Sequence, residues 1–351
     1  MRRRPGSSSL AALLVSATLM LGACGAADPD AAAGTGAPAS SDDAFPVSLE
    51  HAHGTTTIDA KPERIVTLGW MAEDVVASLG IVPVGVPTNY AGEDGYSPWF
   101  SEYVTEELDG ELPEIIEVDG EGEFDLEQIL ALEPDLILAP HSGMTEVQYE
   151  RMSEIAPTVP YAETPWLSGP WQDFTREIGT AMGESELAEE RIDQTEETIA
   201  QTAAEHPELQ GTDFIYGVTL WEGETEMGIY VSDDPRVQFV EQFGLVISPS
   251  LEAATEDAED FAGGVSLENL DTLETDVFVA WEGGAGRTDA TLQDPLVSRW
   301  GPIAAGTYYV MNDKGFAMAT SAPTVLSIPW VLDEGFLDDL SSAVAGGAVI
   351  R

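Results

Sequence analysis

The chain has 351 residues, with 64 acidic and 13 basic side chains and a formal net charge of −51 at pH 7. This excess of negative charge excludes nucleic-acid binding, because the phosphate backbone requires lysine and arginine, and it argues against contact with anionic lipid through a basic patch. Two explanations of the charge stay open: solubility in a salty habitat, and an electrostatic preference for cationic or neutral ligands.

The N-terminal segment indicates export. Arginines at positions 2–4 precede an apolar stretch at 10–23, which is too short to span a bilayer comfortably and is typical of a secretory signal peptide. The stretch ends in Leu-Gly-Ala-Cys24, which resembles a bacterial lipobox, where a peptidase cuts before the cysteine and the sulfur receives a diacylglycerol anchor. Cys24 is the only cysteine, so stability must come from core burial and not from disulfides. Residues 25–44 hold no large apolar side chain and are expected to form a flexible tether.

After the tether, the first half of the chain alternates between strand and helix patterns. Residues 45–58 alternate around Gly54, which is typical of a β-hairpin. Short apolar runs then alternate with helical segments, so we expect a mainly parallel sheet with right-handed crossovers. The predicted elements are strands at 64–68, 82–86 and 159–161, a helix at 73–79, and a helix-then-strand segment at 125–139.

Two helices follow between the halves. Residues 171–182 indicate one helix that ends at Gly183, and residues 184–205 indicate a second, very acidic helix that a His-Pro pair stops. No long glycine- or serine-rich linker separates the halves, and a helical connection permits only small hinge motion. The second half is predicted to hold strands at 213–220 and 307–311, helices near 237–243 and 296–300, a helix-then-strand segment at 266–280, and a final helix after Pro329.

One segment of the chain occurs twice. Residues 125–139 align with residues 266–280, and the two copies share two leucines, two glutamates, an aspartate and the closing alanine. Each copy begins with a candidate N-cap, Asp125 or Ser266, and continues as a short amphipathic helix and an apolar strand. One such unit in each half predicts two similar α/β lobes, and small ligands commonly bind in the cleft between lobes.

Six short motifs follow one another in a fixed order. They are Glu-His-Ala-His-Gly-Thr-Thr-Thr-Ile at 50–58, Lys-Pro-Glu-Arg-Ile-Val at 61–66, Ala-Ser-Leu-Gly-Ile-Val-Pro-Val-Gly-Val at 77–86, Leu-Glu-Pro-Asp-Leu-Ile-Leu at 132–138, Ser-Glu-Ile-Ala-Pro-Thr-Val at 153–159 and Ser-Ile-Pro-Trp-Val-Leu-Asp at 327–333. Together they make the chain resemble the substrate-binding lipoproteins of ABC importers, and most specifically the iron-siderophore branch. The resemblance covers roughly residues 45–340. It implies the class III periplasmic-binding-protein fold, in which two Rossmann-like lobes with mainly parallel sheets are joined by a single rigid backbone helix.

The resemblance implies a division of the chain and a set of partners. The expected ligand is a ferric siderophore, and the expected partner is an ABC permease dimer with its ATPase subunits. The protein is expected to be a monomer, lipid-anchored at the outer face of the bacterial cytoplasmic membrane. The parts are a signal peptide at 1–23, the lipidated cysteine and tether at 24–44, an N-terminal lobe at 45–168, a spine helix at 169–184 and a C-terminal lobe at 185–351.

The resemblance also implies that one surface glutamate on each lobe docks into arginine pockets of the permease. Glu127 and Glu268 occupy these positions, one residue after the first leucine of each repeat copy. A carboxylate there is stabilised by the helix dipole and can pair directionally with arginine. A glutamate at a helix start is also favoured for stability alone, and Glu73 and Asp74 are nearby competitors for the docking role.

Ligand contacts in such sheets come from loops at the carboxyl ends of strands. Because few cations are available, we expect the cleft to favour neutral or cationic ferric hydroxamates over highly anionic catecholates. The siderophore itself would hold the iron, so neither a cofactor nor a direct metal ligand is expected. Core packing is the alternative for each tryptophan, and pairing with a surface acid is the alternative for the arginine. The candidate ligand-binding residues are Trp70, Tyr90, His141, Ser142, Trp166, Trp221, Tyr230, Trp281 and Arg287.

Other functions fit the sequence less well. His51 and His53 share one face of a strand, but with four histidines in the chain a surface role is favoured over a metal site. His141 alone offers an axial ligand for haem, and haem or cobalamin binding on the same fold is the alternative to a siderophore. The chain shows no nucleophile elbow and no phosphate-binding loop, so no enzymatic activity is expected.

Overall fold

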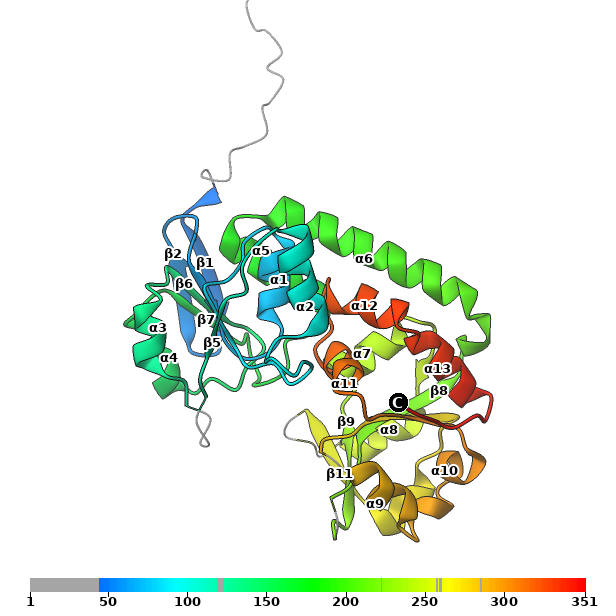
Figure 1. Ribbon diagram of the computed structural model, residues 1–351. Helices are drawn as coiled ribbons and strands as arrows, with labels where there is room; N and C mark the ends of the chain where they lie inside the picture. The colour runs from blue at the N-terminus through cyan, green and yellow to red at the C-terminus, as the bar shows by residue number, and fades with distance from the viewer. Residues whose placement is uncertain (1–43, 119–122, 222, 257, 259–260, 285) are drawn as a thin grey trace, which may run out of the picture. The chain divides into compact units, whose positions relative to one another are not determined.

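The computed structural model describes residues 44–118, 123–221, 223–256, 258, 261–284 and 286–351 (Figure 1). The expected signal peptide, Cys24 and all but the last residue of the expected tether lie outside these ranges. Within the described ranges, no helix has both the length and the apolar composition that crossing a membrane requires.

The opening hairpin leads into a five-stranded sheet, and both agree with the sequence prediction. β1 (Val47–His51) and β2 (Gly54–Ile58) pair antiparallel. The sheet has the strand order β5-β4-β3-β6-β7, and all its pairings are parallel. The edge strand β5 is not predicted by the apolar pattern, because it begins with an exposed glutamate. The strands are β3 (Ile65–Thr67), β4 (Gly85–Pro87), β5 (Glu114–Ile116), β6 (Leu136–Ala139) and β7 (Thr158–Pro160).

Helices cover both faces of this first sheet. Successive side chains of β6 point to opposite faces, so Leu136 and Leu138 pack with α1 and α2 while Ile137 packs with α3 and α4. Burial on both faces explains why the strands are continuous apolar runs. The helices are α1 (Ala72–Ser78), α2 (Pro98–Glu102), α3 (Leu126–Ala131) and α4 (Glu146–Ser153).

The second half forms a seven-stranded mixed sheet. β8, β12, β13 and β14 run parallel in that order, and β10 also pairs parallel with β8. β9 and β11 are antiparallel, and the sequence does not predict them because Gly228, Gly263 and Gly264 interrupt their apolar pattern. The strands are β8 (Asp213–Val218), β9 (Glu226–Tyr230), β10 (Val246–Ile247), β11 (Ala262–Ser266), β12 (Val277–Trp281), β13 (Tyr308–Met311) and β14 (Val349–Ile350).

The helices of the second half are short, and several begin with a capping side chain. Asp234 accepts a hydrogen bond from the backbone of Arg236, and Asp313 accepts one from the backbone of Phe316. The helices are α7 (Pro235–Glu241), α8 (Pro249–Thr255), the 3-10 helix η4 (Leu267–Thr272), α9 (Arg287–Gln293), the 3-10 helix η5 (Val297–Arg299), α10 (Gly301–Ala305), α11 (Lys314–Ser321), α12 (Ser327–Asp333) and α13 (Phe336–Val344).

α5 (Trp171–Met182) and α6 (Ser185–Glu205) connect the two sheets, within one residue of the predicted bounds. α5 ends at Gly183, whose φ of 69° lies in the left-handed region that favours glycine. The two helices then pack closely, since a Cβ at Gly179 would lie 2.4 Å from the Cβ of Ala188. α6 packs against α5 near the first sheet and against α12, which follows the strand β13 of the second sheet (Figure 1).

The repeated segment occupies equivalent places in the two sheets. Its strands, β6 and β12, each lie beside the first strand of their own sheet, β3 and β8. Asp135 accepts hydrogen bonds from the backbone N–H groups of Glu63 (2.8 Å) and Arg64 (2.9 Å). Asp276 accepts the corresponding bond from Asp213 (3.1 Å). The shared aspartate therefore ties each repeat strand to the start of its neighbour.

The helices of the two copies differ. Asp125 caps α3 by accepting from the backbone of Glu127 and Gln128 at 3.0 Å, as predicted. The predicted cap at Ser266 is wrong, because its side chain forms no capping bond and η4 is a 3-10 helix. Ser266 is the last residue of β11, where it pairs with Glu226, so the strand sets the direction in which the chain enters the turn.

Buried side chains join the first lobe (β3–β7) to the second (β8–β14), and we call this contact the seam. The side-chain carboxyl group of Asp74 on α1 accepts hydrogen bonds at Oδ2 from Trp99 Nε1 and from Thr324 Oγ1, both at 2.7 Å. The rings of Trp99 and Trp330 lie 4.9 Å apart.

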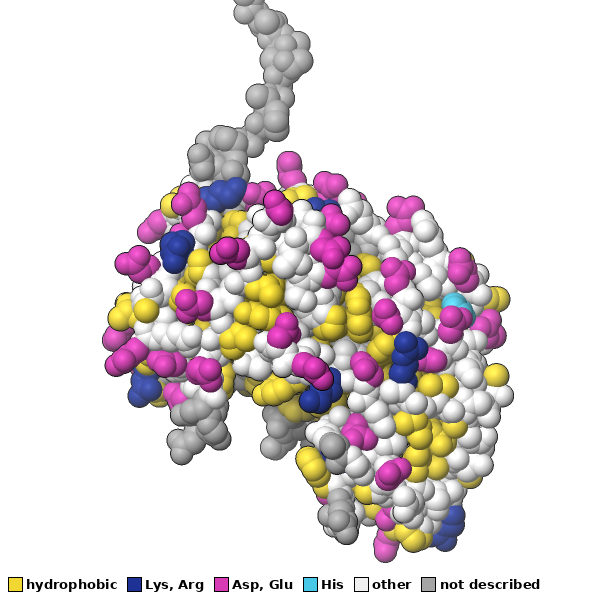
Figure 2. Space-filling view, in the orientation of Figure 1, with side chains coloured by type: hydrophobic (Ala, Val, Ile, Leu, Met, Phe, Trp, Pro, Cys, Tyr) yellow, Lys and Arg dark blue, Asp and Glu magenta, His cyan; other side chains and the backbone are white. Residues whose placement is uncertain are grey.

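Acidic side chains are spread over the visible face of the molecule, whereas basic ones are sparse (Figure 2). Buried acids at the seam are therefore a separate feature from this exposed charge.

Replacing the shared aspartate tests the role of the repeat. We expect Asp135→Ala to lower the free energy of unfolding by about 1–3 kcal/mol, since a charged acceptor for two backbone N–H groups is lost. Asp276→Ala, with one such bond, should cost less. Urea denaturation measures both, and Asp271→Ala in the same repeat copy is the exposed control. Equal and negligible losses in all three variants would contradict this role.

Candidate functional site

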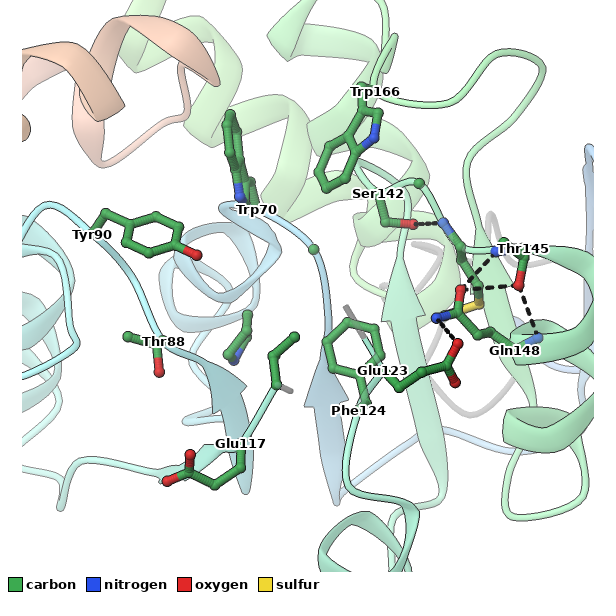
Figure 3. A pocket seen from close by; sticks show the side chains of 15 residues that line it. Trp70, Thr88, Tyr90, Glu117, Glu123, Phe124, Ser142, Thr145, Gln148 and Trp166 are labelled. Carbon is green, nitrogen blue, oxygen red and sulfur yellow. Dashed lines mark hydrogen bonds between the residues drawn. The ribbon is translucent and has the colours of Figure 1, made fainter. Parts of the chain in front are cut away.

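A pocket of about 570 Å³ lies at the carboxyl edge of the first sheet (Figure 3). Loops that follow β3, β4, β5, β6 and β7 build it, which is where open parallel sheets bind their ligands. Its volume falls in the range of small-molecule sites. The lining residues are Gly69, Trp70, Pro87, Thr88, Tyr90, Glu117, Val118, Glu123, Phe124, Ser142, Gly143, Met144, Thr145, Gln148 and Trp166.

Two glycines allow close approaches in the wall of this pocket, one to a backbone carbonyl and one to an indole ring. A Cβ at Gly69 would lie 2.4 Å from the carbonyl oxygen of His141, and a Cβ at Gly143 would lie 2.5 Å from Nε1 of Trp166. Hydrogen bonds hold the same loops together, because Trp70 N–H donates to the His141 carbonyl (3.0 Å) and Trp166 N–H donates to the Ser142 carbonyl (3.1 Å). A larger residue at Gly69 would strike the backbone of the neighbouring loop, and one at Gly143 would displace the indole ring of Trp166.

Trp70 and Trp166 form an aromatic wall, with their ring centroids 5.4 Å apart and their planes inclined by 54°. Both side chains line the pocket, as do Tyr90 and Phe124. Tyr90 is 63% exposed, and Figure 3 shows its hydroxyl directed toward the pocket. These rings give the pocket large apolar surfaces that need no conformational ordering beyond two side-chain torsions.

His141 lies behind this wall and does not line the pocket. Its ring stacks on Trp70 at 6.0 Å and meets Trp166 edge-on at 5.9 Å, and it is 1% exposed. Its Nδ1 is hydrogen-bonded to Ser168 Oγ at 2.7 Å. Burial, with a smaller contribution from Arg236, lowers the pKa of His141 to about 3, so the ring is neutral. The predicted direct contact with a ligand, and the alternative of an axial haem ligand, therefore do not fit this buried position.

The polar side chains of the loop after β6 and of α4 are engaged in hydrogen bonds within the protein. Ser142 Oγ donates to the Ala139 carbonyl at 2.7 Å, so this predicted ligand contact is engaged with its own loop. Thr145 and Gln148 form a capping box at the start of α4. Gln148 Nε2 then donates to Glu123 Oε1 at 3.2 Å (Figure 3), and Glu123 also faces Arg151 at 3.7 Å.

The histidines of the hairpin support the same loop. His53 Nε2 donates to the Met144 carbonyl at 2.8 Å, and the backbone N–H of His53 donates to His51 Nδ1 at 3.2 Å. The predicted surface role is wrong for His51, which is buried and hydrogen-bonded to Thr56 at 2.9 Å. In the described part of the chain, no group of three or more His, Cys, Asp or Glu side chains is placed to hold a metal ion.

The second-lobe candidates form two pairs, and neither lines this pocket. The guanidinium of Arg287 lies 4.4 Å above the ring of Trp221 and 3.6 Å from a carboxylate oxygen of Glu224. Trp281 Nε1 donates to the Tyr230 hydroxyl at 2.6 Å. Trp221 is 52% exposed, whereas Tyr230 is buried. The structure thus gathers Trp70, Tyr90, Ser142 and Trp166 at one pocket and leaves the other candidates apart from it.

Glu73 and Asp74, the alternative candidates for the docking role, are not placed to dock. Both side chains are buried, so neither can reach a partner's surface. Glu73 instead lines a narrow crevice beside the pocket, together with Trp70, Thr88, Asn89, Tyr90 and Met318. Sequence reasoning missed this position, because an acid in the first turn of a helix is normally exposed and stabilises the helix dipole.

Both buried carboxyl groups keep one oxygen without a hydrogen bond. Glu73 Oε1 accepts a long bond from Asn89 at 3.4 Å, and its Oε2 has no partner among the described residues. Asp74 Oδ1 is likewise without a partner in the described ranges. Burial raises the pKa of Glu73 to about 7, and burial together with the adjacent Glu73 raises the pKa of Asp74 well above its ordinary value. The pair therefore holds protons where an isolated carboxyl would be ionised.

Glu127 and Glu268 are exposed at equivalent places. Glu127 is the second residue of α3, and Glu268 is the second residue of η4. Leu130, one helical turn after Glu127, is also exposed. Both carboxylates are free to meet a partner, which is what a docking role requires.

Comparison with known sequences places the chain among solute-binding proteins. Residues 65–313 match the family described as periplasmic binding protein. The chain is 23% identical over 257 residues to the Fe(3+)-citrate-binding protein YfmC of Bacillus subtilis, covering 73% of this chain and 75% of that one. It is 24% identical over 212 residues to the Fe(3+) dicitrate-binding periplasmic protein FecB of Escherichia coli, covering 60% and 66%.

Solved structures agree with the predicted fold class. PiaA of Streptococcus pneumoniae, crystallised with ferrichrome, has a TM-score of 0.77 at 31% identity, covering 86% of this chain and 99% of that one. SirA of Staphylococcus aureus, crystallised with staphyloferrin B, has a TM-score of 0.63 at 22% identity, covering 83% and 97%. The second likeness concerns the fold alone.

The buried carboxyl pair predicts a pH-dependent stability. Because the folded protein binds a proton at Glu73 more tightly than the unfolded chain does, this contribution is complete below the ordinary pKa of 4.5 and is lost as the pH rises through about 7. We expect the free energy of unfolding to fall across this window, and Glu73→Gln to reduce the fall. Burial also raises the pKa of Glu177 to about 7, so some slope should remain.

Denaturation series from about pH 4 to pH 8 measure this slope. Glu127→Gln is the matched control, because it removes one exposed carboxylate and should leave the slope unchanged. An identical slope in the wild type and in Glu73→Gln would contradict the assignment.

Proposed function

The chain belongs to the periplasmic binding protein family, and we propose that it captures a ferric siderophore of the hydroxamate type outside the cytoplasmic membrane and delivers it to an ABC importer. The aromatic pocket at the carboxyl edge of the first sheet carries this proposal. Support comes from PiaA, whose crystallised ligand, ferrichrome, is a hydroxamate complex. Proteins of this family bind solutes without transforming them, so the importer's ATPase subunits would supply the energy.

The pocket suits the outer shell of such a complex. Hydroxamate oxygens already fill the coordination sphere of the iron, so the protein needs to contact only the organic shell. Trp70 and Trp166 offer ring faces for that shell, and Tyr90 offers a hydroxyl group that can donate to a ligand oxygen. The iron is cargo in this scheme, and no protein side chain coordinates it.

The second lobe would complete the site from the other side. Trp221 is an exposed ring that lies against the buried cation Arg287, and Trp281 and Tyr230 form a separate hydrogen-bonded pair. Their proposed role is to contact the complex when it is bound between the lobes. His141 would act as a support for the aromatic wall.

Delivery requires a dock and an anchor. We assign the dock to the exposed carboxylates of Glu127 and Glu268, which can pair with arginine on two permease subunits. The anchor would be lipid on Cys24, which lies outside the described residues. Ferric citrate is a second candidate ligand, because YfmC and FecB are ferric-citrate-binding proteins, and its carboxylate charge distinguishes it from a hydroxamate complex.

A binding titration tests the aromatic pocket. We expect ferrichrome to quench tryptophan fluorescence saturably, and Trp70→Ala to weaken binding about tenfold, since loss of one aromatic contact costs about 1.4 kcal/mol. Trp70→Phe keeps a ring face and should recover most of the affinity. Binding of ferric citrate alone, or undiminished ferrichrome affinity in Trp70→Ala, would refute this use of the pocket.

Charge reversal tests the docking residues. We expect Glu127→Arg or Glu268→Arg to abolish siderophore uptake by cells while leaving affinity for the purified protein unchanged, because the substitution places like charges against the permease. Glu133→Arg makes the same charge change at another exposed position of the repeat and should transport normally. Full uptake by the double variant at 127 and 268 would exclude the assignment.

A further inference from the structure

The charges around the pocket are one-sided. Among the 15 residues that line it are the carboxylates of Glu117 and Glu123 and four aromatic rings, but no lysine or arginine. From this arrangement we infer that the pocket selects siderophore complexes that carry a pendant cationic group, such as a primary ammonium. The inference rests on the proposed function, since it specifies which ferric siderophores the same pocket takes.

The two lining carboxylates differ in how much of their charge is compensated. Glu123 is bonded to Gln148 and faces Arg151 at 3.7 Å. Glu117 follows β5 and is exposed, and its side chain forms no hydrogen bond or ion pair with any described residue. No described side chain therefore competes with a cation that enters the pocket from solvent and pairs with Glu117.

A third carboxyl group lies deeper. Glu73 is 3% exposed and lines the crevice that shares Gly69, Trp70, Thr88 and Tyr90 with the pocket. Its Oε2 has no partner in the described part of the chain. A ligand ammonium beside this carboxyl group would favour its ionised form, so the proton held there would leave for solvent and the unpartnered oxygen would gain an N–H donor. The many exposed acids of the chain can be explained by solubility. Solubility does not explain a buried acid such as Glu73, so Glu73 is separate evidence for a ligand.

The aromatic wall adds a second attraction for a cation. An ammonium group within about 6 Å of a tryptophan or tyrosine ring centre is stabilised by the negative face of the ring. Trp70 and Tyr90 line both the pocket and the crevice, and the ring of Trp166 lies beside that of Trp70 in the pocket (Figure 3). Glu117 lies on the far side of the same pocket from these rings, so a pendant alkylammonium meets both ring faces and a carboxylate within one cavity.

The buried arginines of the second lobe do not offset this preference. Arg236 donates to both carboxylate oxygens of Asp234, at 3.1 and 2.9 Å, and Arg287 faces Glu224 at 3.6 Å. Their charges are therefore largely compensated inside the lobe. Lys314 begins α11 and is exposed, but it is not among the residues that line the pocket. An anionic complex would meet the carboxylates of the first lobe without a matching set of cations there.

Three ferric complexes with one shared core test the inference. The core is a linear trihydroxamate that ends in a primary amine, used as the free ammonium, as the neutral N-acetyl derivative and as the N-succinyl derivative with a carboxylate. We expect the affinity of the full chain to fall about tenfold from the ammonium to the acetyl form, and further to the succinyl form. Calorimetric titration at low and at high salt measures the series.

Matched variants locate the selectivity. Glu117→Gln and Glu73→Gln should each reduce the ratio of ammonium to acetyl affinity by about threefold to tenfold, while the affinity for the acetyl form stays within about twofold. Glu133→Gln removes the same charge at an exposed position outside the pocket and should leave the ratio unchanged. Because Glu117 is exposed, its variant remains informative even if Glu73→Gln fails to fold.

The outcomes separate this inference from the proposed function. Equal affinities for the three complexes would overturn the cation selection and leave siderophore binding intact. A preference that all three glutamine variants reduce equally, and that salt removes, would also overturn it, since the whole surface would then be responsible. Failure to bind any of the three, and ferrichrome as well, would overturn both.

Discussion

The pocket depends on one backbone hydrogen bond, in which the N–H of Trp70 donates to the carbonyl oxygen of His141. This bond ties the loop after β3 to the loop after β6, and it forms only because Gly69 has no Cβ to strike the same carbonyl. Once the loops are joined, His141 lies between the two tryptophans and the interior, where burial keeps it neutral. The aromatic wall is thus set by the backbone, and its rings need no ligand to order them.

Electrostatics divides between the surface and the interior. The exposed acids are many and sparsely compensated, whereas the arginines of the second lobe are paired with carboxylates and the seam holds a protonated acid pair. A buried carboxyl without a charge partner remains neutral because ionising it would cost more than holding a proton. The seam therefore joins the lobes through neutral hydrogen bonds and aromatic contacts, which salt does not screen.

Local patterns anticipated much of the fold. The bounds of α5, the hairpin and the parallel first sheet follow from apolar periodicity and from glycine at chain turns. β9 and β11 were not foreseeable in this way, because their glycines carry no side-chain pattern and their pairing is set by contacts with distant residues. The same limit applies to Ser266, whose capping potential loses to its place at the end of a strand.

The sequence by itself determined the two-lobed class, the repeat, and four of the residues that line the pocket, because these depend on periodicity and on the rule that ligands meet the carboxyl ends of strands. Tertiary structure alone decided the rest. It buried His141 behind the wall, enclosed Glu73 and Asp74 at the seam, and paired Arg287 with Glu224. Burial and charge pairing arise from residues far apart in the chain, as when Thr324 bonds Asp74, and no local pattern encodes such distances.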